Sequence, residues 1–359
     1  MAANSTGIFN AGILIGEMAH AVRLLRTQFN HPMISRIFAL SLITAIAAFA
    51  ADPVPTFQGS IERLDPALDA LIAPEAKIEV LASGFNWSEG PVWRDGGLVF
   101  SDVPENTVFG WKEGDTAAKV VLKPSGSLID PTGQGSNGLA VDAQGNLILC
   151  QHGERRIARL EKDGRFTPLA GKYEGKRFNS PNDLVITKNG TIYFTDPPYG
   201  LKKGGAAAEL AFHGIYALTA AGKVSLLVED VRFPNGIALS PDEKTLYIAV
   251  SDPQNTRVMA YDLQDDGSAK NGRVFFNAQP LKNAERKGGC DGMKVDTNGN
   301  IWTTGPGGVL IIDKNGKHLG SILTGQATAN CAFGGEDRST LYITADMFLL
   351  RVKTLAKGL

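Results

Sequence analysis

The chain has 359 residues with 36 Lys and Arg against 37 Asp and Glu, so its formal net charge at neutral pH is −1. This length allows one large or two medium domains, and the near-zero charge argues against nucleic acid as a partner. The 41 Gly residues, many β-branched residues and no long periodic helix favour short strands joined by tight turns. The composition therefore predicts an all-β sandwich, barrel or propeller.

The first fifty residues differ from the rest of the chain. A basic residue, an apolar run from Ile37 to Ala51 and an Ala-Phe-Ala ending at Ala50 are typical of a secretory signal peptide, which would span 33–50. The run is shorter than the roughly 20 apolar residues of a membrane span, and an uncleaved anchor is the alternative. We expect an N-terminal extension over 1–51, a linker over 52–74, and a periplasmic or secreted protein with no membrane span in its mature form. A start codon assigned upstream of a true start at Met33 would explain residues 1–32.

Six segments repeat along the remaining chain, each a short strand, a hairpin turn rich in Asp, Asn and Gly, and a second strand. The lead residues, 39 to 56 positions apart, are Glu89, Asn137, Asn182, Asn235, Asp291 and Asn330. Further hairpins within these units give room for four strands each, which predicts a six-bladed β-propeller over 75–359. We expect the ring to close by pairing of a strand near 77–83 with the C-terminal strand near 348–354.

Each lead residue precedes the innermost strand of its blade, so the six side chains are expected to form a ring at the central channel. All six carry oxygen, as two carboxylates and four amides. Such donors suit one divalent cation, foremost Ca²⁺, with Mg²⁺, Zn²⁺ and Mn²⁺ as alternatives. Asn-Gly and Asp-Gly are also common turn dipeptides, so turn formation alone is the competing interpretation. The six residues occupy the same position in the repeat, and Glu89 is a poor turn former. Both observations favour metal binding.

Residues 75–355 resemble the SMP-30/gluconolactonase/regucalcin family of six-bladed propellers. The resemblance rests on the motifs SEGPVW, SPNDLVITKNGTIYFTDPPYGL, FPNGIALSPDEKTLYIA and CDGMKVDTNGNIW. It implies a calcium-dependent lactone hydrolase with its metal in the central channel. The metal ligands that it implies are Glu89, Asn182, Asn235 and Asp291.

The remaining site candidates are expected to contact substrate. Asn137 and Asn330 belong to the ring but are expected in the pocket wall rather than on the metal, and Asp183 is expected to orient ligands or solvent. His152 follows an inner hairpin and is either a substrate or catalytic contact or a structural histidine. Some members of the family that the chain resembles use an arginine before the Asn-Asp pair, and Arg177 lies near that place.

Tyr199 and His213 are weaker candidates for the pocket.

The expected reaction is metal-assisted hydrolysis of a sugar lactone, in which the cation polarises the carbonyl and stabilises the oxyanion. Asp291 is the expected general base, with Asp183 and His152 as alternatives, although a carboxylate on a cation is a weak base. An arylesterase or phosphotriesterase is the enzymatic alternative. The non-enzymatic alternatives are a binding propeller stabilised by calcium and a scaffold with an empty channel.

The three cysteines, Cys150, Cys290 and Cys331, lie far apart without C-x-x-C spacing and are expected as buried apolar residues, with a disulfide as the alternative in an exported protein. A monomer is expected because a propeller buries its own sheet edges.

Overall fold

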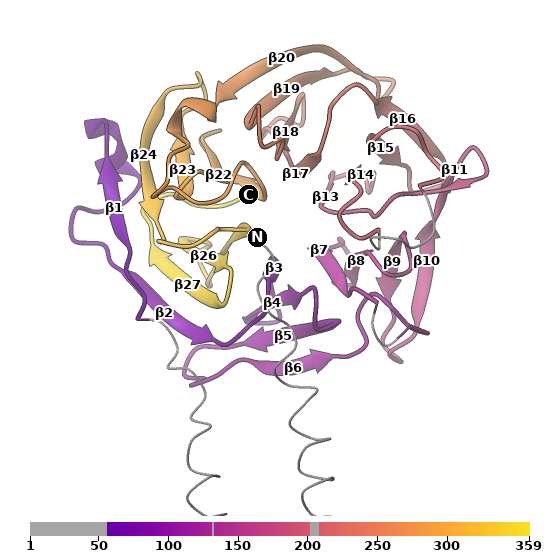
Figure 1. Cartoon of the computed structure of the whole chain (residues 1–359), viewed down its shortest axis with the longest axis horizontal. Helices are drawn as coiled ribbons and strands as arrows, with labels where there is room; N and C mark the ends of the chain where they lie inside the picture. The colour runs from indigo at the N-terminus through magenta and orange to yellow at the C-terminus, as the bar shows by residue number, and fades with distance from the viewer. Residues whose placement is uncertain (1–55, 131–132, 202–207) are drawn as a thin grey trace, which may run out of the picture. The chain divides into compact units, whose positions relative to one another are not determined.

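The computed structural model describes residues 56–130, 133–201 and 208–359. In this part of the chain six sheets of four or five strands stand around a central axis (Figure 1). The predicted six-bladed β-propeller is confirmed. The expected signal peptide over 33–50 lies outside the described residues, and no helix among those described is long and apolar enough to cross a membrane.

Each blade is an antiparallel sheet whose strands follow one another from the propeller axis outward. From the innermost strand, blade one has β3 (Ser88–Arg94), β4 (Gly97–Asp102), β5 (Thr107–Trp111) and β6 (Lys119–Leu122). Blade two has β7 (Ser136–Val141), β8 (Leu147–Gln151), β9 (Arg156–Leu160) and β10 (Phe166–Ala170). Blade three has β13 (Leu184–Ile186), β14 (Ile192–Asp196), β15 (Gly214–Leu218) and β16 (Val224–Val228). Blade four has β17 (Pro234–Leu239), β18 (Thr245–Val250), β19 (Arg257–Leu263) and β20 (Ala269–Asn277).

The last two blades take strands from both ends of the described chain. Blade five has β21 (Met293–Val295), β22 (Ile301–Gly305), β23 (Gly308–Ile312), β24 (His318–Leu323) and, outermost, β1 (Ser60–Arg63). Blade six has β25 (Asn330–Gly334), β26 (Thr340–Ala345), β27 (Phe348–Lys353) and β2 (Ile78–Ser83). The short hairpin of β11 (Lys172–Tyr173) and β12 (Lys176–Arg177) lies between blades two and three in sequence, and the 3-10 helices are η1 (Pro66–Ala70) and η2 (Gln279–Leu281).

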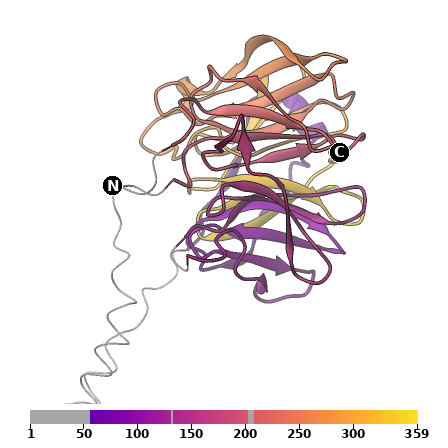
Figure 2. The same cartoon turned by 90° about the vertical axis from the view of Figure 1, so that its right-hand side faces the viewer.

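The circle of blades closes as predicted, by pairing of β2 with β27. Ile78 lies opposite Val352 and Ser83 opposite Phe348. The side view shows the indigo N-terminal strands next to the yellow C-terminal ones (Figure 2). The pairing satisfies the edge of the last blade with a strand from the other end of the chain.

The stretch 52–74, expected to be a linker, is in large part a component of the propeller. Strand β1 pairs with β24, and Leu68 and Ile72 are fully buried in a core cluster that includes Trp302. Leu68 on η1, and Leu71 and Ile72 directly after it, give this segment an apolar face to bury.

The inner hairpins turn as their composition predicts. In blade two the Asp142 carboxylate accepts the N–H groups of Gln144 and Asn146, at 3.0 and 2.8 Å. Gly145 between them has a φ of 81°, which a residue without a Cβ adopts at little cost. Blade five repeats this arrangement with Asp296.

Candidate functional site

The side chains of the repeat's lead residues meet at one end of the innermost strands, as the common phase predicts. Asn137 Nδ2 donates to Asn182 Oδ1 at 3.0 Å, and Asn182 Nδ2 donates to Asn235 Oδ1 at 2.5 Å. From blade six, Asn330 Nδ2 donates to Glu89 Oε2 at 3.2 Å. These five side chains are buried, and their hydrogen bonds form two runs, one through Asn182 and one between Asn330 and Glu89. Together with Asp291 we call these side chains the ring.

The glycine after most lead residues marks a seam between two blades. The N–H of Gly236 donates to the Asp291 carbonyl at 3.0 Å, and a Cβ on Gly236 would lie 2.1 Å from that oxygen. A Cβ on Gly90 would likewise lie 2.1 Å from the Asn137 carbonyl oxygen. The backbones of neighbouring blades are in contact at these points. Each dipeptide of a lead residue and its glycine lies at or in an innermost strand, so the interpretation of these dipeptides as hairpin turns is wrong.

Three carboxylates share this space, and burial raises the pKa of each. Burial raises the pKa of Asp291 well above its ordinary value, and the charges of Glu89 and Asp183 add to the shift. Burial raises the pKa of Glu89 to about 7, against the N–H bond from Gly90. Like charges in a poorly solvated site make a bound cation strongly favourable.

Two ring oxygens lack a hydrogen-bond donor among the described residues. They are Asp291 Oδ1 and Asn137 Oδ1, both buried. Buried oxygens are rarely left without a partner, and a cation or a substrate hydroxyl would supply one.

The ring fits one divalent cation. In the described part of the chain no three His, Cys, Asp or Glu side chains are placed to hold a metal by themselves. A cation would therefore need amide oxygens as well, and the ring offers those of Asn182 and Asn235 beside the carboxylates of Glu89 and Asp291. This donor set is made of oxygen alone, which suits calcium.

His152 is brought to the ring, where it contacts an amide on each side. Its Nε2 lies 3.2 Å from Asn182 Oδ1, and its Nδ1 lies 3.1 Å from Gln134 Oε1. Burial lowers the pKa of His152 to about 4, so the imidazole is neutral at pH 7 and has one N–H. Because Asn182 Oδ1 already accepts from Asn137, we assign that N–H to Nε2, which requires the Gln134 amide in the reverse of the orientation that the structure gives.

Asp183 and Asn330 join opposite blades across the axis. Asp183 Oδ1 accepts the Leu184 N–H at 2.9 Å, and its Oδ2 accepts from Asn330 Nδ2 at 3.4 Å. Asn330 Oδ1 in turn accepts the Cys331 N–H at 2.8 Å. Asn330 therefore links the carboxylates of Glu89 and Asp183 through its amide nitrogen.

Arg177 is not brought to the ring. It lies on β12, where its Nη2 donates to the Glu154 carbonyl at 3.2 Å and its N–H donates to Glu209 at 2.7 Å. The β11–β12 hairpin, which no pattern in the sequence predicted, carries this residue, and its role as a substrate contact stays a prediction.

Tyr199 was only a weak candidate in the sequence, yet it lies at the ring. Burial raises the pKa of its hydroxyl, with the Asp291 charge adding to the shift and hydrogen bonds with Ser251 and Asn235 opposing it. Its ring stacks on Phe233, with centroids 6.0 Å apart. The signal in the sequence was its place directly after the third inner hairpin.

Two buried aspartates hold the loops before the ring; Asp196 was considered in the sequence for the pocket mouth, and Asp102 was not. Asp196 accepts the N–H groups of Asn179 and Ser180, both at 2.7 Å, three and two residues before Asn182. In blade one Asp102 does the same for Asn86 and Trp87, before Glu89. The signal was the shared aromatic-Ser/Thr-Asp ending of the second strand in these two units.

The three cysteines are buried and free, as expected for small apolar residues.

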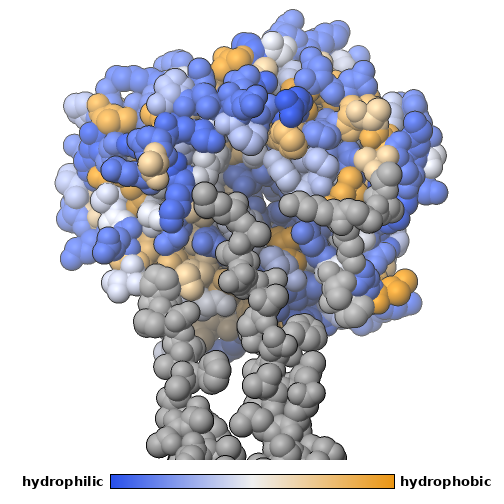
Figure 3. All heavy atoms as spheres, in the orientation of Figure 1, coloured by the Kyte–Doolittle hydropathy of each residue, from blue (hydrophilic) through white to orange (hydrophobic). Residues whose placement is uncertain are grey.

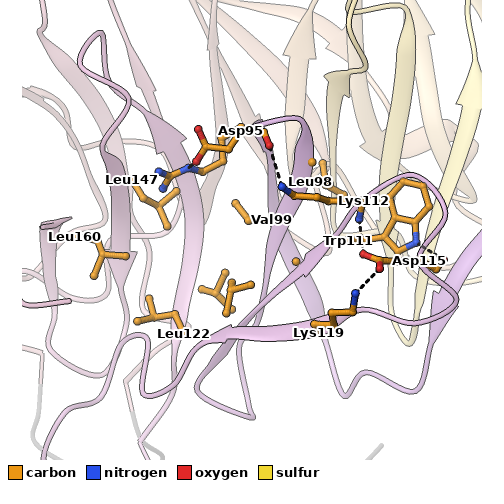
Figure 4. Close-up of a pocket in the computed structure, with 15 residues that line it drawn as sticks. Asp95, Leu98, Val99, Trp111, Lys112, Asp115, Lys119, Leu122, Leu147 and Leu160 are labelled. Carbon is orange, nitrogen blue, oxygen red and sulfur yellow. Dashed lines mark hydrogen bonds and ion pairs between the residues drawn. The ribbon is translucent and has the colours of Figure 1, made fainter. Parts of the chain in front are cut away.

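A cavity of about 450 Å³ lies elsewhere, lined mainly by β4, β5 and β6 of blade one with Leu147 and Leu160 of blade two (Figure 4). Leu98, Trp111, Leu147 and Leu160 are among its lining residues, and the Asp115–Lys119 ion pair lies at its edge. No ring residue lines this cavity. The face seen in Figure 1 is mainly hydrophilic with scattered hydrophobic residues (Figure 3).

Comparison with known proteins places this architecture in a family. Residues 87–346 match the SMP-30/Gluconolactonase/LRE-like region. A gluconolactonase of Zymomonas mobilis is 38% identical over 313 residues, covering 84% of this chain and 87% of the relative. The structure of a gluconolactonase from Xanthomonas campestris superposes with a TM-score of 0.73 at 35% identity, covering 85% of this chain and 99% of that one. A calcium-binding regucalcin from Agrobacterium tumefaciens shares the fold, with a TM-score of 0.61 at 22% identity over 78% of this chain and 97% of its own. The chain belongs to the SMP-30/gluconolactonase/LRE-like family.

Proposed function

We propose that this protein is a divalent-metal-dependent hydrolase that opens sugar lactones, as a gluconolactonase does. The similarity to two proteins named gluconolactonase, at 38% and 35% identity, supports the lactone substrate. The observation that carries the metal requirement is Asp291 Oδ1, a buried carboxylate oxygen without a partner among the described residues, in a ring of oxygen donors. Calcium is the proposed ion, because the donors are all oxygen and a regucalcin of the same fold is a calcium-binding protein.

The ring residues divide into metal ligands and groups that position them. Glu89, Asn182, Asn235 and Asp291 would hold the cation, which when bound supplies Lewis-acid polarisation of the lactone carbonyl. His152 Nε2–H holds the oxygen of Asn182. Its unprotonated Nδ1 faces Gln134 rather than the ring, so His152 acts as a positioning residue and not as the base.

The general base is assigned to Asp291. Its Oδ1 has no donor among the described residues, whereas both oxygens of Asp183 accept hydrogen bonds. Burial and neighbouring acids raise the pKa of Asp291, which favours proton uptake from an attacking water. A bound cation opposes this shift, so the role requires that only one Asp291 oxygen binds the cation and that the other contacts the attacking water. Asn137 Oδ1 is free to accept a substrate hydroxyl.

The test is hydrolysis of glucono-δ-lactone, followed by proton release. Protein treated with chelator is assayed before and after addition of calcium, magnesium, zinc or manganese. Asp291→Ala and Glu89→Ala are compared with Asp266→Ala, which removes an exposed acid from the β19–β20 hairpin. An aryl ester and a phosphotriester serve as alternative substrates.

Loss of lactone turnover on chelation, its return with a metal, and its absence in both ring variants but not in Asp266→Ala would support the proposal. Turnover that survives complete chelation would refute the metal requirement. A protein that melts at a higher temperature with metal but hydrolyses no lactone would be a calcium-stabilised binding propeller. Preference for the aryl ester or the phosphotriester would reassign the substrate.

We also propose that the protein is exported and monomeric. The support for export is the signal-like sequence over 33–50. Pairing of β2 with β27, which covers the edge of β27 with a strand of the same chain, supports a monomer. N-terminal sequencing of the mature protein and light scattering test these two proposals.

A further inference from the structure

One position of the repeat departs from its equivalents in the other blades. The third residue after the lead residue is apolar in five units, where it is Val92, Ala140, Val185, Ala238 or Phe333. In blade five the same position is Lys294. A lone cation at a site that is otherwise apolar is costly to bury without a compensating charge.

Lys294 lies on β21 between the ring and a second cavity. This cavity, of about 510 Å³, is lined from all six innermost strands by residues that follow the ring positions. Lys294 lines it, is partly buried, and donates from Nζ to the Met293 carbonyl at 2.9 Å. Its charge also acts on two of the three buried acids, Glu89 and Asp183.

The charges of the three buried acids and of Lys294 sum to two negative units. Glu89, Asp183 and Asp291 contribute three negative charges when ionised, and Lys294 contributes one positive charge. The remaining two negative charges match one divalent cation. Without Lys294 the same acids would match a trivalent ion.

We propose that Lys294 sets the charge selectivity of the metal site, so that the ring takes a divalent and not a trivalent cation. This inference rests on the metal site proposed above. Lys294 acts as a resident counter-charge, balancing Asp183 from the side of the second cavity while the other acids bind the ion. A unit charge at roughly 10 Å in a medium of effective dielectric constant about 20 changes a binding constant by about tenfold for each unit of ligand charge.

The test measures binding of calcium and of lanthanum by titration calorimetry, on full-length protein freed of metal by chelator. Lys294→Met is predicted to raise the ratio of lanthanum to calcium affinity by about tenfold. Lys294→Arg keeps the charge and should keep the wild-type ratio. Lys223→Met, which removes an exposed lysine from the β15–β16 hairpin, is the matched control and should also leave it unchanged.

A double variant tests the charge count itself. Lys294→Met combined with Asp183→Asn restores a net charge of two negative units and should return the ratio to the wild-type value. Thermal melting checks the fold of each variant, and Lys294→Gln replaces Lys294→Met if the latter does not fold.

An unchanged ratio in Lys294→Met, with calcium still bound by the wild type, would overturn this inference and leave the metal site intact. A wild-type protein that binds no calcium, magnesium, zinc or manganese would overturn both.

Discussion

Replacing Gly236 by Ala tests whether the glycine after a lead residue is required by contact between blades. The new Cβ would lie 2.1 Å from the Asp291 carbonyl oxygen and 2.8 Å from the Gly292 Cα. Relief requires the seam to open by more than an ångström, which stretches the 3.0 Å hydrogen bond from the Gly236 N–H to that same carbonyl. Overpacking costs about 1–3 kcal/mol, and a buried N–H and C=O left unpaired cost about 1–3 kcal/mol more. We expect a loss of roughly 4 kcal/mol in the free energy of unfolding.

The assay is thermal unfolding followed by circular dichroism, without and with calcium. A loss of this size corresponds to a fall of roughly 10 °C in Tm for a domain of this size. Gly171→Ala is the matched control, because a Cβ there meets only Arg156 Cβ at 3.7 Å, an ordinary contact. Because the Asp291 backbone must move, calcium should also stabilise Gly236→Ala less than it stabilises the wild type. If Gly236→Ala and Gly171→Ala both melt within about 2 °C of the wild type, where a surface substitution would fall, the seam argument is refuted.

The remaining predictions concern buried ionisable groups. The pKa of His152 is about 4 in the fold against 6.5 unfolded, so metal-free protein should lose about 3 kcal/mol of stability as pH falls from 6.5 through 4. His152→Gln should remove this loss in urea titrations, and an equal loss in both proteins contradicts it. The raised pKa of Glu89 has the opposite sign: stability present below pH 4.5 is lost as pH rises through about 7. Glu89→Gln should reduce this loss of stability with rising pH in chelated protein, and added calcium should reduce it in the wild type. An equal or steeper loss in Glu89→Gln would contradict this prediction. Asp196→Asn keeps one acceptor for two N–H groups, so it should lower the free energy of unfolding by about 1–2 kcal/mol. It should also weaken calcium binding, because these N–H groups hold the loop before Asn182. Unaltered calcium affinity would show that Asp196 does not position Asn182.

Repetition made much of the fold and of the ring predictable. The six lead residues share one phase, and equal phase in a propeller means an equal place around the axis, so the meeting of Asn137, Asn182 and Asn235 was predictable from the sequence alone. Closure by β2 and β27 followed from the two unpaired strand patterns at the ends of the repeat.

Features outside the repeat were not predictable in the same way. Strand β1, with the sequence SIER, shows no clear alternation and gains its place only by pairing with β24. The register of Arg177 depended on the β11–β12 hairpin, an insertion that has no equivalent in the other units to guide it. The contact of Asp183 with Asn330 crosses the axis between residues 147 positions apart, and no local pattern encodes it.

The most direct test of the metal site is a crystal structure of the protein soaked in calcium or manganese, with anomalous scattering used to locate the ion. We predict one anomalous peak on the channel axis, from an ion bound by the carboxylates of Glu89 and Asp291 and the amide oxygens of Asn182 and Asn235, at about 2.3–2.6 Å for calcium. A fully active protein with no peak in the ring, or with its metal bound elsewhere, would contradict it.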